Sequence, residues 1–269
     1  MLILTRPLPK RFAAAALSRH SREAAPIHQA RAEAQHADYV AALREAAPNA
    51  VFVEAPAADD LPDCVFVEDI ALAVPGGVMF TTPGASSRQA EVEGVRAALL
   101  SAGLQPKGAL APSDTLDGGD VLSLGGLGTL VGRSRRTTPG AARALAEASG
   151  LPAVLVPVPG DELHLKSAIT WAGPSHGLLC AESARGWFEA TLAPLLPGGP
   201  AGVGGVTFLT DPLAANVVIV GETALWQGQD CPAFAALRAK PGLRWRRVNM
   251  DELAKADGAL TCCSVIFDD

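Results

Sequence analysis

The stretch CVFVEDIALAVPGGVMFTT, residues 64–82, decides the fold of this chain. Two apolar runs read as β-strands on either side of the turn Pro75-Gly76-Gly77, so the stretch predicts a hairpin. A helix is expected over 91–103, where Gly103 supplies the end signal, and a further strand is expected before Leu110. The unit is therefore hairpin, helix, strand.

The same unit recurs three more times. Its hairpin, helix and strand are read over 120–132, 139–150 and 152–158, then over 165–180, 182–196 and 205–209, and then over 216–227, 231–240 and 243–250. The turn markers Pro75, Gly125, Gly173 and Gly221 are separated by 50, 48 and 48 residues. Steps of this length indicate a solenoid or a radial array.

The two ends of the chain supply a fifth unit. Residues 259–267 read as a strand without a hairpin partner, whereas 1–5, 27–47 and 50–54 read as strand, helix and strand. Joining the ends closes a ring, so we predict an α/β five-bladed propeller of ββαβ units with pseudo-five-fold symmetry, in a single domain over 1–269. The segment 7–26 interrupts this fifth unit and is a candidate lid.

Composition limits the classes of function. Hydrophobic residues make up 49% and charged residues 19%, which is typical of a compact soluble protein. A net charge of −6 without a dense basic stripe argues against a nucleic-acid partner. The chain shows neither a signal-peptide pattern nor an apolar run of about 18 residues, so no membrane association is expected. Five cysteines without a CxxC pair indicate reduced thiols, and we expect a cytoplasmic protein.

Polar residues fall at the same place in every unit, on or just before its first strand. They are Asp63, Glu68 and Asp69 in the first unit, Asp117 and Asp120 in the second, His164 in the third, Asp211 and Asn216 in the fourth, and Cys262 in the fifth. An enclosed core does not hold such groups without partners. If the first strands line the central axis, these side chains converge on one cavity.

Cys262 and His164 are a candidate catalytic pair, although each has a plainer reading. Strand alternation would send Cys262 and Cys263 to opposite faces, and a lone cysteine is usually part of the core. A histidine before a strand is often a hydrogen-bonded structural residue. Their equivalent placement in two units favours catalysis, because a catalytic thiol needs a histidine from elsewhere in the fold. Asp117 could orient that histidine.

The acidic run PDCVFVED, 62–69, needs a cation, because unpaired buried carboxylates are costly. A structural lysine or arginine supplies it, or the substrate does. Gly118-Gly119 permits either close backbone approach or a positive φ, with a plain tight turn as the alternative.

The sequence predicts neither a metal site nor a dinucleotide cofactor. It contains no HxH or HExxH motif and no clustered Cys/His spacing. The glycine-rich stretch 125–132 joins two strands instead of opening a helix, so it is not a dinucleotide-binding motif.

Six ordered blocks carry a family resemblance. They are ARAEAQH (30–36), LPDCVFVEDIA (61–71), SRQAEVE (87–93), LDGGDVL (116–122), HLKSAITWAGP (164–174) and DGALTCCSV (257–265). At these residues the chain resembles the dimethylarginine dimethylaminohydrolases, guanidino-group-modifying enzymes of the pentein superfamily that are built as five-bladed β/α propellers. The resemblance spans nearly the whole chain.

The resemblance implies a role for each candidate residue. Cys262 would be the nucleophile, His164 the general acid and base, and Asp117 the third catalytic carboxylate, where related enzymes often have glutamate. The implied substrate-binding residues are Asp63, Glu68 and Asp69 for the guanidinium, Arg88 and Arg136 for the α-carboxylate, and backbone carbonyls near Leu17 and Ala256 for the α-amino group. Arg136 is preferred to Arg135 because it fits the family's GxSxRT pattern.

The implied reaction is hydrolysis of asymmetric dimethylarginine or monomethylarginine to citrulline and an amine, through a covalent thiouronium on the cysteine. The resemblance implies a small-molecule substrate, no cofactor and no metal, a place in arginine metabolism and nitric oxide regulation, and leaves a homodimer possible. Two alternatives stay open. An arginine deiminase shares the chemistry but releases ammonia, although LDGGD, TCCSV and the short chain favour the dialkylarginine enzyme. A non-catalytic five-bladed binding module would lack part of the catalytic set.

Overall fold

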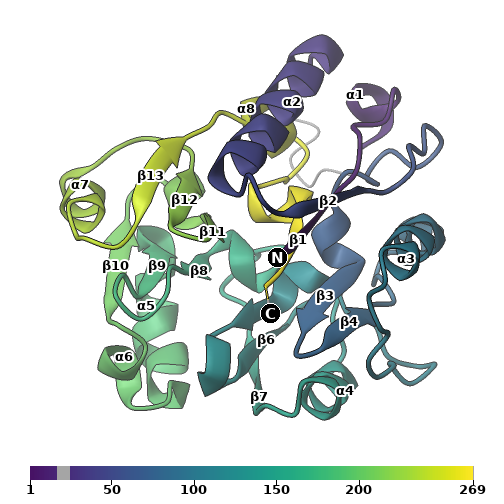
Figure 1. Cartoon of the computed structure of the whole chain (residues 1–269). Helices are drawn as coiled ribbons and strands as arrows, with labels where there is room; N and C mark the ends of the chain where they lie inside the picture. The colour runs from purple at the N-terminus through teal and green to yellow at the C-terminus, as the bar shows by residue number, and fades with distance from the viewer. Residues whose placement is uncertain (17–24, 269) are drawn as a thin grey trace.

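Five small β-sheets stand around a central axis in the computed structural model, which describes residues 1–16 and 25–268 (Figure 1). Each sheet is called a blade. The first holds β3 (Ala71–Val74) and β4 (Gly77–Phe80); the second β5 (Val121–Ser123), β6 (Thr129–Arg133) and β7 (Ala153–Pro157); the third β8 (Ile169–Trp171), β9 (Leu178–Ala181) and β10 (Val206–Leu209); the fourth β11 (Val218–Val220), β12 (Thr223–Trp226) and β13 (Arg244–Arg247); the fifth β14 (Val265–Phe267), β1 (Leu2–Thr5) and β2 (Val51–Glu54).

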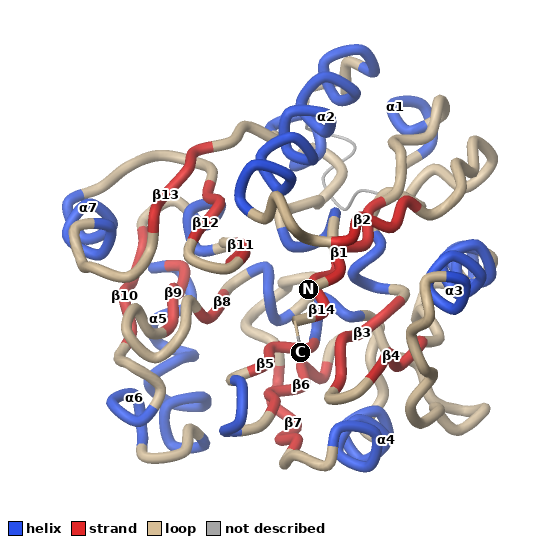
Figure 2. The backbone as a smooth tube through the Cα atoms, viewed as in Figure 1, coloured by secondary structure: helices blue, strands red, loops and turns tan. Residues whose placement is uncertain are grey.

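The longer helices lie toward the outside of the ring, whereas the first strand of each blade lies toward its centre (Figure 2). The helices are α1 (Phe12–Ala15), α2 (Gln29–Ala46), α3 (Glu91–Ser101), α4 (Gly140–Ser149), α5 (Arg185–Trp187), α6 (Gly199–Gly202), α7 (Pro232–Arg238) and α8 (Asp251–Ala254); the longer ones are α2, α3, α4 and α7. As predicted, α3 and α4 end just before glycines with positive φ, Gly103 and Gly150. None of the helices among the described residues is long and apolar enough to span a membrane.

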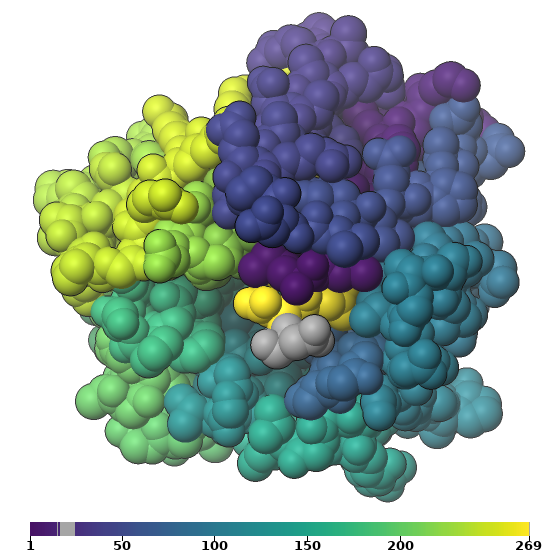
Figure 3. Space-filling view, viewed as in Figure 1, coloured from purple at the N-terminus to yellow at the C-terminus, as the bar shows by residue number. Residues whose placement is uncertain are grey.

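The ring closes by pairing the first strand with the last. Leu2 of β1 lies opposite Phe267 of β14 in an antiparallel ladder, and β1 continues in parallel with β2. Figure 3 shows the purple N-terminal segment directly against the yellow C-terminal one. The other three-stranded blades repeat this order, with an antiparallel first pair and a parallel outer strand. The predicted five-bladed α/β fold is confirmed.

The predicted third strand of the first blade is wrong. Within the described chain, that sheet has two strands, and a single parallel bridge joins Val78 to Pro106 where the third strand was expected. Hydrogen bonds run from the Val78 amide to the Gln105 carbonyl and from the Lys107 amide to the Val78 carbonyl. The pairing stops after these two bonds, because Gly108 adopts a positive φ of 63° that takes the chain out of the extended conformation.

The polar residues precede the inner strands instead of lying on them, which corrects the strand boundaries read from the sequence. A short 3₁₀ turn comes before each first strand: Val67–Asp69, Gly118–Asp120, Leu165–Ser167, Pro212–Ala215 and Thr261–Cys263. Cys262 and Cys263 therefore lie in one turn, and the turn, not strand alternation, gives their side chains different surroundings. Cys263 is buried in the apolar core, whereas Cys262 is partly exposed.

Among the described residues, the apolar core is divided into five clusters, each of which joins the strands of two neighbouring blades to the helical segment packed against them. In the fifth blade, Tyr39 and Leu43 of α2 pack under the turn that carries Cys262. Burying a side chain of this size stabilises the fold by about 1.5–3 kcal/mol. Because these clusters hold neighbouring blades together, the turns that precede the inner strands are held around the axis.

Candidate active site

A small pocket at one end of the axis collects most of the predicted site residues. Its lining includes Asp63, Asp69, Arg88, Asp117, Arg136, His164, Ala256 and Cys262. These residues come from the first, second, third and fifth blades or from the segment just before β14. The pocket leaves only about 30 Å³ of free volume, which is room for one or two water molecules. An amino-acid substrate would therefore have to displace part of the lining.

His164 and Asp117 form a buried pair in this pocket. The His164 Nε2 lies 3.0 Å from Asp117 Oδ2, and the Gly84 amide donates to Asp117 Oδ1 at 2.7 Å. Burial alone would lower the pKa of His164, but the charge of Asp69 and the bond to Asp117 outweigh it and raise this pKa to about 9. The imidazole is therefore protonated at neutral pH and can donate a proton.

Asp69 is a buried carboxylate held in its charged form. Its Oδ1 accepts from the Gly119 amide at 2.9 Å, and Arg88 Nη1 donates to its Oδ2 at 2.5 Å. Burial would raise the pKa of Asp69, yet His164 and Arg88 outweigh burial and lower it to about 2. The carboxylate can thus receive a cation in the pocket.

Cys262 lies on the Thr261–Cys263 turn, which is fixed from two sides. The Tyr39 hydroxyl of α2 donates to the Leu260 carbonyl at 2.9 Å, and the Ala259 amide donates to the Cys262 Sγ at 3.4 Å. Burial and the neighbouring carboxylates of Glu68 and Asp69 raise the pKa of the Cys262 thiol to about 12. The free protein therefore holds a protonated thiol.

Arg88 is almost completely occupied by the protein itself. It donates to Asp69, to both carboxylate oxygens of Glu91, and to the Asp63 and Phe66 carbonyls. Both Arg88 and Glu91 are buried. Arg88 therefore supplies the structural cation that the acidic run requires, and its predicted contact with a substrate carboxylate stays a prediction.

Arg136 is better placed for a substrate than its neighbour. Its Nη1 lies 4.0 Å from Asp117 Oδ2, and the residue lines the pocket, whereas Arg135 is exposed and does not. Ala256 also lines the pocket from the segment after α8. Leu17 falls outside the described residues, so its predicted role and the middle of the candidate lid are left as predictions.

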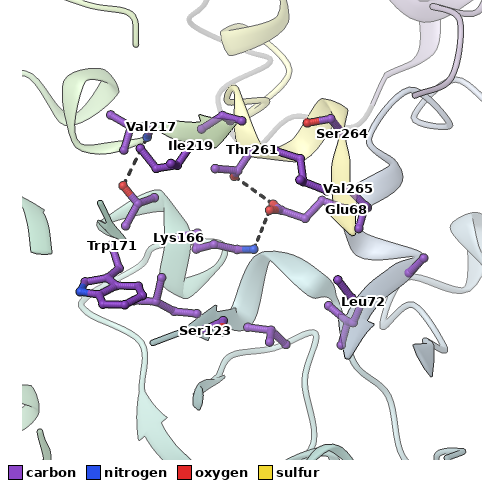
Figure 4. A pocket seen from close by; sticks show the side chains of 17 residues that line it. Glu68, Leu72, Ser123, Lys166, Trp171, Val217, Ile219, Thr261, Ser264 and Val265 are labelled. Atoms are coloured by element: carbon purple, nitrogen blue, oxygen red, sulfur yellow. Dashed lines mark hydrogen bonds and ion pairs between the residues drawn. The ribbon is translucent and has the colours of Figure 1, made fainter. Parts of the chain in front are cut away.

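Glu68 does not line this pocket. Its Oε1 accepts from Lys166 Nζ at 2.5 Å and its Oε2 from Thr261 Oγ1 at 3.0 Å. Figure 4 shows these three side chains at the end of a second cavity, of about 290 Å³, that the inner strands of all five blades surround. Asp211 is also absent from the pocket, because it caps the Pro212–Ala215 turn by accepting from the Leu213 amide.

Asp120 was noticed in the sequence without a role, and the structure gives it one. Its Oδ1 accepts from the Leu165 amide at 2.9 Å, while its Oδ2 accepts from Ser134 Oγ and Thr137 Oγ1, each at 2.6 Å. Asp120 thus holds Leu165, which follows His164, and it holds Ser134 and Thr137, which lie before and after Arg136 in the chain. The two hydroxyl residues flanking Arg136 in the sequence were the available signal.

Three of the pocket residues could hold a metal ion. Ligand atoms of Asp69, Asp117 and His164, all buried, lie within 4.8 Å of one another. Each already has a partner, since Asp117 pairs with His164 and Asp69 with Arg88. The protonated state of His164 also disfavours a metal, which needs a neutral imidazole.

Gly119 is required for the position of His164. A Cβ at Gly119 would lie 2.5 Å from the His164 Nδ1, and its φ is not positive, so close approach explains this glycine. We expect Gly119→Ala to displace the imidazole and to lower kcat/KM by about a hundredfold. Gly126→Ala is the control, because its Cβ would meet nothing within 4 Å. Equal activity of the two variants in a citrulline assay would contradict this role.

Comparison with known proteins adds to this geometry. No family model matches the chain. It is 37% identical over 219 residues to the N(G),N(G)-dimethylarginine dimethylaminohydrolase of Streptomyces coelicolor, covering 79% of this chain and 78% of that protein. The same enzyme of Pseudomonas aeruginosa is 26% identical over 242 residues, covering 88% and 89%. The solved structure of a cysteine-to-serine mutant of that enzyme, complexed with citrulline, superposes with a TM-score of 0.82 at 26% identity, covering 98% and 97%.

A second solved dimethylarginine dimethylaminohydrolase, a histidine-to-glycine variant in an adduct with S-methyl-L-thiocitrulline, gives a TM-score of 0.81 at 25% identity, covering 98% of each chain. A five-bladed ring with a thiol, an imidazole and carboxylates at one end of its axis defines a pentein-type enzyme. Within that class, the chain belongs to the dimethylarginine dimethylaminohydrolase family.

Proposed function

We propose that this protein hydrolyses N-omega-methylated arginines to citrulline and dimethylamine or methylamine, with Cys262 as the nucleophile. The observation that carries the proposal is one pocket in which the Cys262 turn faces the His164–Asp117 pair and the Asp63 and Asp69 carboxylates. The closely related Streptomyces coelicolor enzyme bears the name of this reaction.

The guanidinium of the substrate is the cation for which the acidic residues are arranged. Asp69 stays ionised because its pKa is lowered to about 2, and Asp63 lines the same pocket. We assign both to guanidinium binding and Arg136 to the substrate carboxylate, through a charge-assisted hydrogen bond. Binding fixes the guanidinium carbon, which delocalisation otherwise makes a poor electrophile, in reach of the thiol.

The reaction then needs a thiolate and a proton donor. A bound cation next to Cys262 offsets the carboxylates that raise the thiol pKa, so we expect the thiol to lose its proton to solvent and the thiolate to form in the complex. The sulfur adds to the guanidinium carbon, and protonated His164 donates to the amine nitrogen as the carbon–nitrogen bond breaks. Water deprotonated by His164 attacks the thiouronium carbon, the carbon–sulfur bond breaks, and citrulline and the free thiol result.

Substrate preference separates this function from arginine deimination. We expect kcat/KM for asymmetric dimethylarginine to exceed that for arginine by about tenfold or more, because the methyl groups add apolar contact that arginine lacks. Citrulline formation and amine release, measured side by side on both substrates, check this. A preference for arginine, with ammonia released, would make the protein a deiminase, whereas inactivity on both would favour a binding module.

The wider setting is part of the same proposal. The partner is a small molecule, in keeping with solved relatives complexed with citrulline or joined to a substrate analogue. We place the protein in the cytoplasm and in arginine metabolism, with nitric oxide regulation and a homodimer as predictions that follow from the family.

A further inference from the structure

A polar network joins four blades directly beneath Cys262. Thr261 Oγ1 donates to Glu68 Oε2 at 3.0 Å, and Lys166 Nζ donates to Glu68 Oε1 (Figure 4). Thr261 Oγ1 also accepts from Asn216 Nδ2 at 3.1 Å. The Asn216 amide group also donates to the Lys166 carbonyl at 3.1 Å and accepts from the Thr261 amide at 3.0 Å. Glu68, Lys166, Asn216 and Thr261 belong to the first, third, fourth and fifth blades.

Three members of the network are close in sequence to a residue of the active-site pocket. Thr261 precedes Cys262, Glu68 precedes Asp69, and Lys166 follows His164 by two positions. A shift of any member therefore moves the backbone that carries the nucleophile, the acid or the proton donor. The network is the point where the blades that supply these groups are joined across the axis.

The network has little freedom to rearrange. The side chains of Glu68 and Lys166 are only 10% and 13% exposed, and Asn216 is buried. The single hydroxyl hydrogen of Thr261 is used toward Glu68, so its lone pair is free to accept from Asn216. In such a buried network, any arrangement that breaks one hydrogen bond leaves a buried polar group without its partner, which costs free energy. Alternative arrangements of these side chains are therefore disfavoured.

We propose that Thr261, Asn216 and the Glu68–Lys166 ion pair are positioning residues that hold the Cys262 turn against His164, and that Glu68 does not bind substrate. Unlike Asp69, whose carboxylate is also hydrogen-bonded by the protein but lines the active-site pocket, Glu68 lines the inner-strand cavity, where Lys166 and Thr261 hold its two oxygens. This inference rests on the proposed function in taking Cys262 as the nucleophile.

The same network sets the electrostatic surroundings of the thiol. Cys262 is influenced by Glu68, Asp69 and Lys166, and it shares its pocket with Asp63, Arg88, Asp117, Arg136, His164 and Asp257. Among these, the Glu68 charge disfavours the thiolate and the Lys166 charge favours it. Replacing Glu68 by its neutral isostere should therefore shift thiol ionisation even with no substrate present.

The test compares Thr261→Val, Thr261→Ser and Glu68→Gln with the unchanged protein. Alkylation of Cys262 by iodoacetamide is followed against pH without substrate, and kcat and KM are measured on asymmetric dimethylarginine. We expect Thr261→Val to lower kcat about tenfold with KM nearly unchanged, and Thr261→Ser to restore it. Glu68→Gln should move the alkylation midpoint to lower pH. Thr223→Val, the same change at a buried position of β12, is the control and should change neither readout.

Two results would overturn the proposal. One is equal kcat for Thr261→Val and the unchanged protein, or equal loss for the valine and serine variants, since the hydroxyl would then be irrelevant. The other is a higher KM for Glu68→Gln with an unshifted alkylation profile, which would return Glu68 to substrate binding. Should Thr261→Val fail to fold, Glu68→Gln decides through the same profile. Because alkylation needs no turnover, absence of any activity on methylated arginine would refute the proposed function alone.

Discussion

Replacing Cys262 with serine is expected to lower citrulline formation from asymmetric dimethylarginine by about a thousandfold or more, because the reaction has no second thiol to form the covalent intermediate. The hydroxyl of serine is far less readily ionised than a thiol and is a weaker nucleophile. The first measurement is the citrulline released per molecule of folded protein. The second is mass spectrometry of the unchanged protein quenched during turnover, which should show an adduct on the tryptic peptide that contains Cys262.

Cys263→Ser is the matched control for this prediction, since the same change is made one residue away in the same turn. Cys263 is fully buried in the core, so a hydroxyl there costs about 1–3 kcal/mol of stability and leaves the chemistry intact. The control should unfold at lower denaturant concentration and keep its activity per folded molecule. Activity that survives in Cys262→Ser but disappears in Cys263→Ser would exchange the roles of the two cysteines.

His164→Gln is expected to lower kcat by about a hundredfold or more, because the leaving amine loses its proton donor. In the unchanged protein, where we expect the bound cation to keep the Cys262 thiolate, kcat should fall as pH rises through the His164 pKa of about 9, and the variant should lack this descending limb. The raised pKa also stabilises the fold: this contribution is complete below the unfolded value of about 6.5 and is lost as pH rises through about 9.

Denaturant unfolding at several pH values separates the two effects. Between the unfolded and folded pKa values, the free energy of unfolding should decline for the unchanged protein and stay flatter for His164→Gln. His176→Gln serves as control, because His176 is a buried histidine of the third blade that does not line the pocket. A pH profile that is the same in His164→Gln and the unchanged protein would remove His164 from the mechanism.

The ring was predictable because its evidence is repetitive. Equally spaced turn markers report the same hairpin four times, and the unpaired strand at 259–267 needs the strand at 1–5. The strands of a single unit, taken without the other four, are predicted less reliably. The first blade lost its third strand because Gly108, with its positive φ, turns the chain away after Lys107, and pattern alone does not distinguish two bridging hydrogen bonds from a strand.

The turns before the inner strands could not be predicted from periodicity. Runs such as CVFVEDIALAV and ALTCCSVIF are mostly apolar, which a strand and a buried 3₁₀ turn satisfy equally well. This ambiguity matters for Glu68, because the Val67–Asp69 turn sends Glu68 and Asp69 into different cavities. The acids were identified as a group from the sequence, but only the turn geometry separates them.

The pairing of β1 with β14 has a consequence for how the catalytic centre comes into being. Leu2 lies opposite Phe267, and the Cys262 turn directly precedes β14. Contacts between such distant segments form slowly, since a large loop must close first. We therefore expect reactivity to emerge only at the last stage of refolding, so that recovery of catalysis reports the moment at which the two ends of the chain meet.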